Sequence, residues 1–593
     1  MKVIIAETAG FCMGVKRAVD LAIDHSRKEN ETVYTYGPLI HNRQTVEMLN
    51  SRGVTELDND SPLKKAPIII RAHGIPLHSE TKLRSKGHEI IDGTCPKVKT
   101  VHRVITKYRK LGYTIIITGD EGHAEVIGLM GYAGDRGLLV QSPSDIDSIP
   151  PTEKVCLVSQ TTFDRELFDD IAARARTRFK EQQVVVKKTI CSATKRRQTE
   201  TKEIASMVDA MIVVGGKNSA NTQRLAKISS ACNTPTQHVE SEKELDIDAL
   251  EHCNTVGITA GASTPQWMIK RVVDYLQFMS HRKKKTLKDR VKRVLDLCAI
   301  FNIFIAAGAT AAYYASCTIQ RIDLPLQEFA LGGVVVFFYF LSIYLVNSMT
   351  SIEITQHLGI SRYQFYQSHK TMILLIAEIS IALLLAASLT INLSLFYLML
   401  FSTTLGALYH ITIVPLPLRR IFKYSNLKDV PTSRDLFVAL AWAILATFIP
   451  HAIRNQLVFT KSTVFVFGWI FVLAFLRSLM ADLRDIEGDR IMGRETLVTI
   501  MGEKRVKKGI HRMIWACLII TVCYSAIMAI TDFGKYSHGD ISLLFQLPAI
   551  VYMMVFVRWH EKNHRTRSTL FNILSEAPFY IAAIGAWVTW RIN

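Results

Sequence analysis

The sequence predicts an α/β domain fused to an all-α bundle of transmembrane helices, and three observations lead to this prediction. Short β-branched runs alternate with amphipathic stretches over the first 280 residues, as expected for largely parallel sheets. Nine apolar runs of close to 20 residues follow, which is the length that spans a bilayer. Between these parts, eight of the twelve residues in 282–293 are Lys or Arg. We therefore divide the chain into residues 1–280, a basic linker at 281–293 and a membrane part at 294–593.

Length, charge and cysteine usage exclude several classes of protein. At 593 residues the chain is too long for a single core. A net charge of +19 raises the possibility of nucleic-acid binding, but much of the excess lies in the linker and between apolar runs, which is typical of membrane topology. We therefore expect no nucleic-acid partner. The ten cysteines contain no CxxC pair, so we expect no disulfide framework and a reducing compartment.

The first 280 residues alternate between strand-like and helix-like segments. Six strands are predicted at 3–6, 68–71, 114–118, 154–159, 211–214 and 255–259. Helices are predicted at 98–111 and 166–181. In parallel α/β folds ligands gather where strand ends meet helix starts, and the polar motifs of this part lie at such places.

Three cysteines follow a strand-like run or turn and precede a helix: Cys12 in AGFCMGVKRA, Cys95 in DGTCPKV and Cys191 in ICSATKRRQ. A helix N-terminus favours the thiolate that binds a metal. An isolated cysteine is more often a small buried hydrophobe, and that alternative stays open from the residues alone. Because Cys156, Cys232 and Cys253 lack comparable polar neighbours, we assign them to structure.

Polar loops supply a second set of candidates. The histidines are His41 in LIHNRQ, His73 in RAHGIP and His123 in EGHAEV. A lone histidine is more often structural, but three in Gly- and Pro-rich loops suit an anion site or a proton relay. The segments 217–225 (KNSANTQRL) and 259–267 (TAGASTPQW) add hydroxyl and amide groups that hold a diphosphate. Together these motifs predict a metal centre that faces a phosphorylated ligand.

Through these motifs, residues 1 to about 280 resemble the 4-hydroxy-3-methylbut-2-enyl diphosphate reductase (LytB) family, whose members catalyse the last step of the methylerythritol phosphate isoprenoid pathway. The resemblance implies three α/β units in a pseudo-threefold arrangement around a [4Fe–4S] cluster held by Cys12, Cys95 and Cys191. It implies reductive removal of the substrate hydroxyl as water, giving isopentenyl and dimethylallyl diphosphate, with electrons from an external donor such as ferredoxin or flavodoxin. Glu125 matches the proton donor, assisted by Thr161. The positions that match substrate contacts are His41, His73, His123, Thr161, Ser219, Ala220, Asn221 and Ser263, of which Ala220 replaces a frequent serine.

The membrane part is predicted from its apolar runs and the charges between them. The nine runs are 295–317, 326–347, 371–388, 392–414, 436–453, 463–480, 513–530, 541–557 and 573–590. They are too apolar and too many for buried helices of a soluble protein. With the N-terminus inside, the loops after runs two, four, six and eight carry 2, 5, 8 and 4 Lys or Arg, whereas the opposite loops carry four in all. This pattern predicts a multi-pass protein of the cytoplasmic (inner) membrane, with membrane lipids as neighbours and residues 1–280 in the cytoplasm.

The loop after the sixth run contains DLRDIEGDR, with Asp482, Asp485 and Asp489. Their spacing puts three carboxylates on one face of a helix end. A solvated acidic turn is the alternative, but carboxylates aligned at the mouth of a span are suited to holding Mg²⁺ against a diphosphate.

With this motif and the GRETL that follows it, residues 290–593 resemble UbiA-type intramembrane prenyltransferases. The resemblance implies nine helices, Mg²⁺ and transfer of a prenyl group from a prenyl diphosphate to an aromatic or other lipid acceptor. Tyr409, Arg419 and Arg420 lie where the family has its tyrosine and basic residues. In the family's first acidic motif Asn347 is kept. The aspartates of that motif are replaced by Ser348, Ser351 and Thr355.

Two hypotheses for the membrane part therefore stay open. It is a prenyltransferase fused to the reductase, or it is an inactive anchor or lipid-binding module. The altered first motif, in which Glu353 is out of register, favours the second hypothesis, whereas the intact second motif favours the first. We expect no direct channelling, since such transferases usually take longer chains than the reductase makes.

Overall fold

A computed structural model describes residues 1–29, 32–57, 67–179, 183–283, 287–350, 365–409, 432–456, 458–491, 495–531, 543–562 and 568–592. The chain divides into two compact units, Met1–Ser280 and His281–Asn593. Five residues of the predicted sites, Ser351, Glu353, Thr355, Arg419 and Arg420, lie outside the described residues.

The first unit contains three four-stranded sheets in which every strand pairing is parallel. The first sheet has the order β1 (Lys2–Ile5), β12 (Thr255–Ala260), β10 (Ala210–Val214) and β11 (Thr236–Val239). The second has the order β3 (Val54–Glu56), β2 (Val33–Tyr36), β4 (Ile68–Ile70) and β5 (Ile90–Asp92). The third has the order β7 (Gly137–Val140), β6 (Thr114–Thr118), β8 (Val155–Ser159) and β9 (Val184–Val186).

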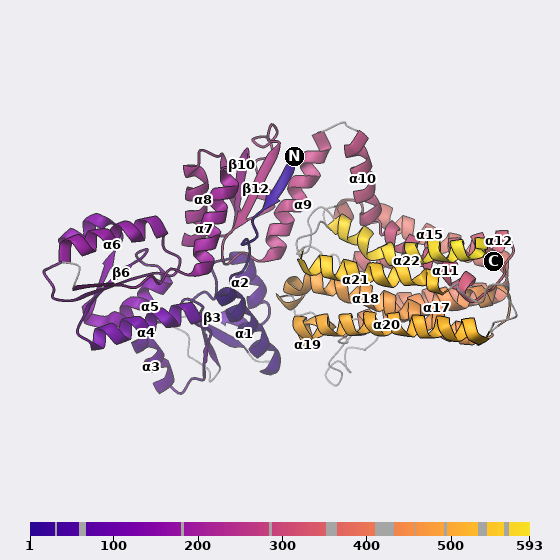
Figure 1. Ribbon diagram of the computed structural model, residues 1–593, viewed down its shortest axis with the longest axis horizontal. Helices are drawn as coiled ribbons and strands as arrows, with labels where there is room; N and C mark the ends of the chain where they lie inside the picture. Colours follow the sequence, from indigo (N-terminus) through magenta and orange to yellow (C-terminus); the bar gives the residue numbers. More distant parts are fainter. Residues whose placement is uncertain are drawn as a thin grey trace. The chain divides into compact units, whose positions relative to one another are not determined.

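Helices connect these strands and cover the sheets. They are α1 (Met13–Glu29), α2 (Arg43–Asn50), α3 (Leu77–Ser85), α4 (Pro96–Lys110), α5 (Ala124–Ala133), α6 (Arg165–Phe179), α7 (Ser192–Ala205), α8 (Ala220–Ala231) and α9 (Gln266–Lys283). Figure 1 shows α7 and α8 on one side of the sheet that contains β10 and β12, and α9 on the other. Because helices cover both faces, β8 and β10 are buried along their whole length, which explains their continuous apolar sequences.

All six predicted strands and both predicted helices are present, within a few residues of the predicted bounds. The other six described strands are each only three or four residues long. Five of them lie at sheet edges and β2, with the sequence VYTY, is internal. Most of these strands are too short or too polar to stand out in the sequence, whereas β9, with the sequence VVV, is as apolar as the predicted β4 and was missed.

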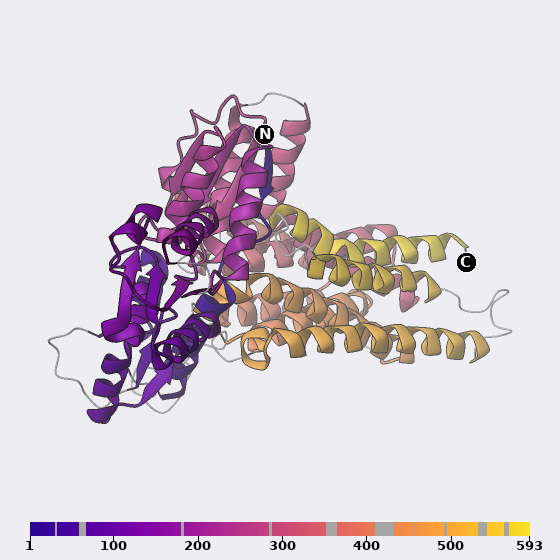
Figure 2. The same cartoon turned by 60° about the vertical axis from the view of Figure 1, so that its left-hand side comes forward.

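The second unit is a helical bundle. Its described helices are α10 (Leu287–Ile300), α11 (Ile303–Ile319), α12 (Leu326–Thr350), α15 (Lys370–Ile391), α16 (Leu393–Leu408), α17 (Ser433–Ile453), α18 (Lys461–Ile491), α19 (Leu497–Met501), α20 (Glu503–Thr531), α21 (Leu547–Lys562) and α22 (Ser568–Ile592). The long helices of the last third of the chain, orange to yellow, run side by side in Figures 1 and 2. Each of the nine predicted apolar runs overlaps a helix.

Six of these described helices, α12, α15, α17, α18, α20 and α22, are long and apolar enough to cross a membrane. A seventh is obtained if α10 and α11, which are bent by 72° at their junction, form one span. The remaining two predicted runs overlap the 16-residue helices α16 and α21 and extend beyond the described residues.

The predicted run 295–317 is broken because Asn302 adopts a left-handed conformation, with φ of 59°. Asparagine tolerates this conformation better than most residues do. The Asn302 amide also donates hydrogen bonds of 3.3 Å to the Tyr344 carbonyl and to the Ser348 hydroxyl on α12. The bend is therefore fixed by contacts with a neighbouring helix.

An ion pair is buried inside the bundle. Arg477 of α18 pairs with Glu576 of α22 and donates a hydrogen bond of 3.2 Å to the Tyr344 hydroxyl. The Arg477 guanidinium also lies 5.3 Å from the ring centroid of Trp442 on α17. A buried charge in a membrane helix must be paired, and these contacts tie α12, α17, α18 and α22 together.

Candidate functional site

Three cysteines stand at the N-terminal ends of three helices of the first unit. Cys12 directly precedes α1, Cys95 caps α4 and Cys191 caps α7. Each cysteine amide donates to a carbonyl of another loop: Cys12 to Ala262 at 3.0 Å, Cys95 to Ala72 at 2.9 Å and Cys191 to Thr161 at 2.9 Å. The cysteine loops are therefore held by bonds that join segments far apart in the sequence.

The three thiols line one cavity of about 90 Å³. Burial raises the pKa of the Cys95 thiol, and the charges of Cys12 and Cys191 contribute in the same direction. A Cβ atom at Gly14 would lie only 2.5 Å from the Cys95 sulfur, so the glycine makes room for that thiol. Three thiols on helix N-termini around one cavity fit a cluster with three cysteine ligands and one open iron.

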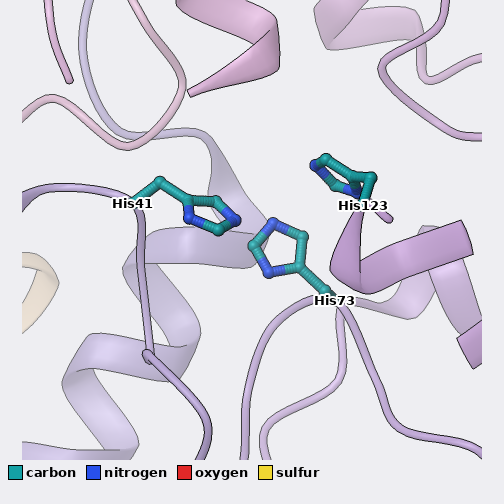
Figure 3. A group of neighbouring side chains, drawn as sticks. All are labelled: His41, His73 and His123. Atoms are coloured by element: carbon teal, nitrogen blue, oxygen red, sulfur yellow. The ribbon is translucent and has the colours of Figure 1, made fainter. Parts of the chain in front are cut away.

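Three histidines converge on the same cavity from separate elements. His41 precedes α2, His73 follows β4 and His123 caps α5. Their ring centroids are 4.9 Å (His41–His73), 5.8 Å (His41–His123) and 5.3 Å (His73–His123) apart. Figure 3 shows the three rings turned toward one another. One ring nitrogen of each lies within 4.8 Å of the others, so the trio has the spacing of a metal site as well as of an anion site.

Burial keeps these imidazoles neutral in the absence of a ligand. It lowers the pKa of His123 to about 4 and the pKa of His73 well below its usual value, and in both cases the neighbouring His41 contributes. The pKa of His41 is lowered by burial and by the charge of Arg71. Two buried ring nitrogens, Nε2 of His41 and Nδ1 of His73, have no hydrogen-bond partner. A bound anion would supply a hydrogen-bond partner and would favour protonation of the rings.

Helix α8 adds amide and hydroxyl groups. Ser219 caps this helix, Ala220 is its first residue, and both line the cavity together with Asn221. The Asn221 side-chain nitrogen is buried without a partner. Ser263 lies opposite and donates a hydrogen bond of 3.4 Å to the His41 carbonyl. A helix N-terminus beside unpaired polar groups is suited to binding a phosphate.

Glu125 is the acidic residue of this cavity. The Thr161 amide donates to its Oε1 atom at 2.7 Å and the Thr161 hydroxyl donates to its Oε2 atom at 2.9 Å. Burial raises the pKa of Glu125 to about 7 although both hydrogen bonds oppose this. A carboxyl that is half protonated near neutral pH suits a general acid.

All twelve residues predicted from the sequence for this site line the cavity. Their individual roles stay predictions. Arg197, which the sequence did not single out, also lines it and donates to the carbonyls of Ala260 and Gly10 on either side of the cavity wall. It lies six residues after Cys191, which is not a same-face helical spacing, so the sequence offered no signal for it.

The predicted acidic motif of the membrane part lies on α18. Asp482 and Asp489 are buried, and Asp485 is half-buried. Asp482 is paired with Arg434 of α17, and Asp489 also faces that guanidinium. Asp485 instead accepts from the Nε and Nη2 atoms of Arg484 at 3.0 and 2.8 Å. Asp482 and Asp489 therefore face one arginine, Arg434, whereas Asp485 contacts another, Arg484.

This arrangement does not fit a Mg²⁺ site. Asp482 is paired with the guanidinium of Arg434, and Asp485 with that of Arg484. Among the described residues, the three carboxylates do not form a group with metal-ligand spacing. Asn347 and Ser348 lie at the end of α12. Tyr409, at the end of α16, lies with its ring centroid 6.0 Å from that of Phe437. We derive no metal-dependent step for this part.

Comparison with known proteins identifies both parts. Residues 3–277 match the family model described as LytB protein, and residues 367–575 match the UbiA prenyltransferase family. The 4-hydroxy-3-methylbut-2-enyl diphosphate reductase of Aquifex aeolicus (strain VF5) is 42% identical over 278 residues, which cover 46% of this chain and 96% of the relative. The chain belongs to the LytB family.

The LytB domain and the UbiA domain each resemble solved structures. A structure of (E)-4-hydroxy-3-methyl-but-2-enyl diphosphate reductase shares 42% identity at a TM-score of 0.39 and covers 47% of this chain and 100% of that chain. A UbiA homolog from Archaeoglobus fulgidus bound to DMAPP and Mg²⁺ shares 18% identity at a TM-score of 0.35 and covers 49% and 99%. With six or seven apolar helices among its described residues, the UbiA part is a multi-pass membrane domain.

Proposed function

We propose that the LytB domain reduces 4-hydroxy-3-methylbut-2-enyl diphosphate to isopentenyl and dimethylallyl diphosphate. The observation that carries this proposal is a single cavity lined by three thiols, three neutral imidazoles and a carboxyl whose pKa is about 7. The name of the Aquifex relative, 96% of whose length is covered at 42% identity, supports the same reaction.

Cys12, Cys95 and Cys191 would hold the [4Fe–4S] cluster. When bound, the cluster supplies electrons and Lewis acidity, which cleavage of an allylic C–O bond requires. The electrons come from an external donor such as ferredoxin or flavodoxin. Overall, the substrate takes up two electrons and two protons, its C–O bond breaks, a C–H bond forms and water leaves.

The chain's own residues bind the substrate and deliver a proton. The diphosphate accepts hydrogen bonds from His41, Ser219, Asn221 and the amides at the start of α8, which replace water around the anion. Glu125 donates a proton to the departing hydroxyl oxygen. The resulting carboxylate keeps two hydrogen bonds from Thr161, which stabilise its charge in the buried site.

This proposal is tested by anaerobic assay of the full chain in detergent, after iron and sulfide reconstitution, with reduced methyl viologen as electron source. We expect Glu125→Gln to lower kcat about 10²–10⁴-fold, the range for loss of a general acid, while the iron content stays unchanged. Glu166→Gln removes a carboxylate from an exposed ion pair with Lys202 and serves as the control. An active Glu125→Gln variant would remove this residue from the mechanism, and an inactive wild type with a full cluster would refute the reaction.

For the UbiA domain we infer transfer of a prenyl group from a prenyl diphosphate to a lipid or aromatic acceptor. The match to the prenyltransferase family supports this function. One oxygen of Asp482, Oδ2, is buried without a hydrogen-bond partner, so this carboxylate can still accept a hydrogen bond. The alternative is an inactive anchor or lipid-binding module.

Labelled prenyl diphosphates and a panel of aromatic acceptors, with Mg²⁺ or with EDTA, distinguish these functions. A prenylated product that is lost in Asp482→Asn and Asp489→Asn supports transfer, and its persistence in EDTA excludes the Mg²⁺ that the family leads us to expect. If no donor gives a product while the reductase is active, the domain is an anchor or a binding module.

The excess of Lys and Arg in the linker and in alternate loops supports an orientation of the chain in the membrane. We place the domain boundary in the linker 281–293 and the LytB domain on the cytoplasmic side of the inner membrane. Protease accessibility of residues 1–280 in inverted and right-side-out vesicles tests this: cleavage in right-side-out vesicles alone would reverse the orientation.

A further inference from the structure

A second cavity, of about 580 Å³, opens in the LytB domain beside α4. Its walls come from α4, from β5 and from Tyr132 of α5. None of the residues that line it also lines the cysteine cavity. Its volume lies within the range of small-molecule sites. It is therefore a separate hollow large enough for an organic ligand.

One face of α4 gives this cavity an excess of positive charge. Of the cations that line it, Lys99 is paired with Asp92. Glu80, the other carboxylate of the lining, is paired with Arg84 at 2.8 Å. Three further cations of the lining have no carboxylate partner among the described residues: Arg103, Lys107 and Lys110. Because they are three or four residues apart, they lie in a row along one side of the helix.

His102 gives an independent indication of a ligand. Its side chain lines the cavity and is only 7% exposed, and its Nε2 atom has no hydrogen-bond partner. The ring stacks on Tyr132, with centroids 4.0 Å apart and planes at 17°. A buried polar atom without a partner costs free energy, which a bound ligand recovers.

The chemistry of the lining indicates the class of ligand. The three unpaired cations match the charge of a diphosphate, which carries several negative oxygens close together. The stacked pair of His102 and Tyr132 offers aromatic surface to an organic group, mainly through Tyr132, which is half-buried, whereas Ile70 and Ile75 are almost fully buried. We propose that this cavity binds an organic diphosphate at a site distinct from the substrate cavity. This proposal does not depend on the reductase activity.

The wall of this site is shared with the loops of the cysteine cavity. Thr94, which lines it, directly precedes Cys95, and its amide donates to Asp92 at 2.9 Å. On the other side of His102, a Cβ atom at Gly74 would lie 2.9 Å from the His102 Cε1 atom, and Gly74 follows His73. A ligand in this site thus contacts Thr94, the neighbour of Cys95, and His102, which packs closely beside Gly74.

Equilibrium dialysis of the full chain in detergent tests the proposal with three labelled probes: ADP, geranyl diphosphate and inorganic diphosphate. We compare the wild type with Arg103→Gln/Lys107→Gln. The matched control is Arg174→Gln/Lys202→Gln, which removes the same charge from two exposed ion pairs elsewhere on the domain. Both pairs of substitutions lie on exposed side chains, so the fold is retained, and circular dichroism checks this.

We expect ADP or geranyl diphosphate to bind at a site whose affinity falls about tenfold or more in Arg103→Gln/Lys107→Gln and is unchanged in the control. Binding of ADP would identify the ligand as a nucleotide, and binding of geranyl diphosphate would identify it as an isoprenoid. The proposal is overturned if neither probe shows a site sensitive to the double substitution, or if the control weakens binding equally. Inorganic diphosphate that binds as tightly as both organic probes would refute a role for the organic group.

Discussion

Substitution of Thr161 by valine tests how the protein sets the acidity of Glu125. Thr161→Val removes the hydroxyl that donates to Oε2 at 2.9 Å and leaves the amide that donates to Oε1 at 2.7 Å. A hydrogen bond to a charged group stabilises it by about 1.5–3 kcal/mol, and 1.36 kcal/mol corresponds to one pKa unit. The pKa of Glu125, raised by burial to about 7, should therefore rise by roughly one to two further units.

The assay is the pH dependence of kcat/KM for the reductase reaction. Glu125 acts as an acid when protonated, so the wild-type rate should fall as the pH rises through about 7. In Thr161→Val this alkaline limb should move to higher pH. Thr161→Ser keeps a hydroxyl and should leave the limb in place. A limb that does not move in Thr161→Val, or that moves to lower pH, would refute the assignment of Glu125 as the acid controlled by Thr161.

Three further changes test other parts of the structure. Gly14→Ala places a Cβ 2.5 Å from the Cys95 sulfur, so we expect iron content after reconstitution to fall well below that of the wild type; a full cluster would contradict the tight approach. Asn302→Ala should lower the free energy of unfolding by about 1–2 kcal/mol, because alanine tolerates the left-handed conformation less well than asparagine and cannot donate the two hydrogen bonds to α12. Asn302→Gly loses the same hydrogen bonds but tolerates the conformation, so it should cost less, as measured by thermal unfolding in detergent. Arg434→Ala leaves Asp482 buried without its partner and should destabilise the membrane domain by about 3–5 kcal/mol. Asp482→Asn in the same chain should restore part of that loss, and equal stability of single and double variants would show that the pair is not coupled.

The sequence predicts the reductase fold well where strands are buried on both faces. The runs at β4, β6, β8, β10 and β12 are largely apolar or β-branched, as expected for strands that are covered on both faces. The strand β2, with its tyrosines and threonine, has no such pattern although it is internal. Its place depends on pairing with β3 and β4, which lie later in the chain.

The candidate sites were predictable to different extents. Cysteines and histidines in polar loops indicated a metal and anion site, but their convergence depends on loops from all three sheets, so only the family resemblance could group them. The bend at Asn302 escaped detection because one asparagine barely changes the hydropathy of an apolar run. The pairing of Asp482 with Arg434 was also hidden, since 48 residues separate the two in the chain.

The pairing of β1 with β12 has a consequence for biosynthesis. The first strand of the chain forms its hydrogen bonds with the last strand of the LytB domain, and the Cys12 amide donates to Ala262 in the same region. During translation, the loop that carries Cys12 must therefore wait until about residue 262 has left the ribosome. The first apolar helices follow closely behind that residue. The cavity that the three cysteines line thus becomes complete only shortly before the first apolar helices are made, so the formation of this site and membrane insertion fall in the same short interval of synthesis.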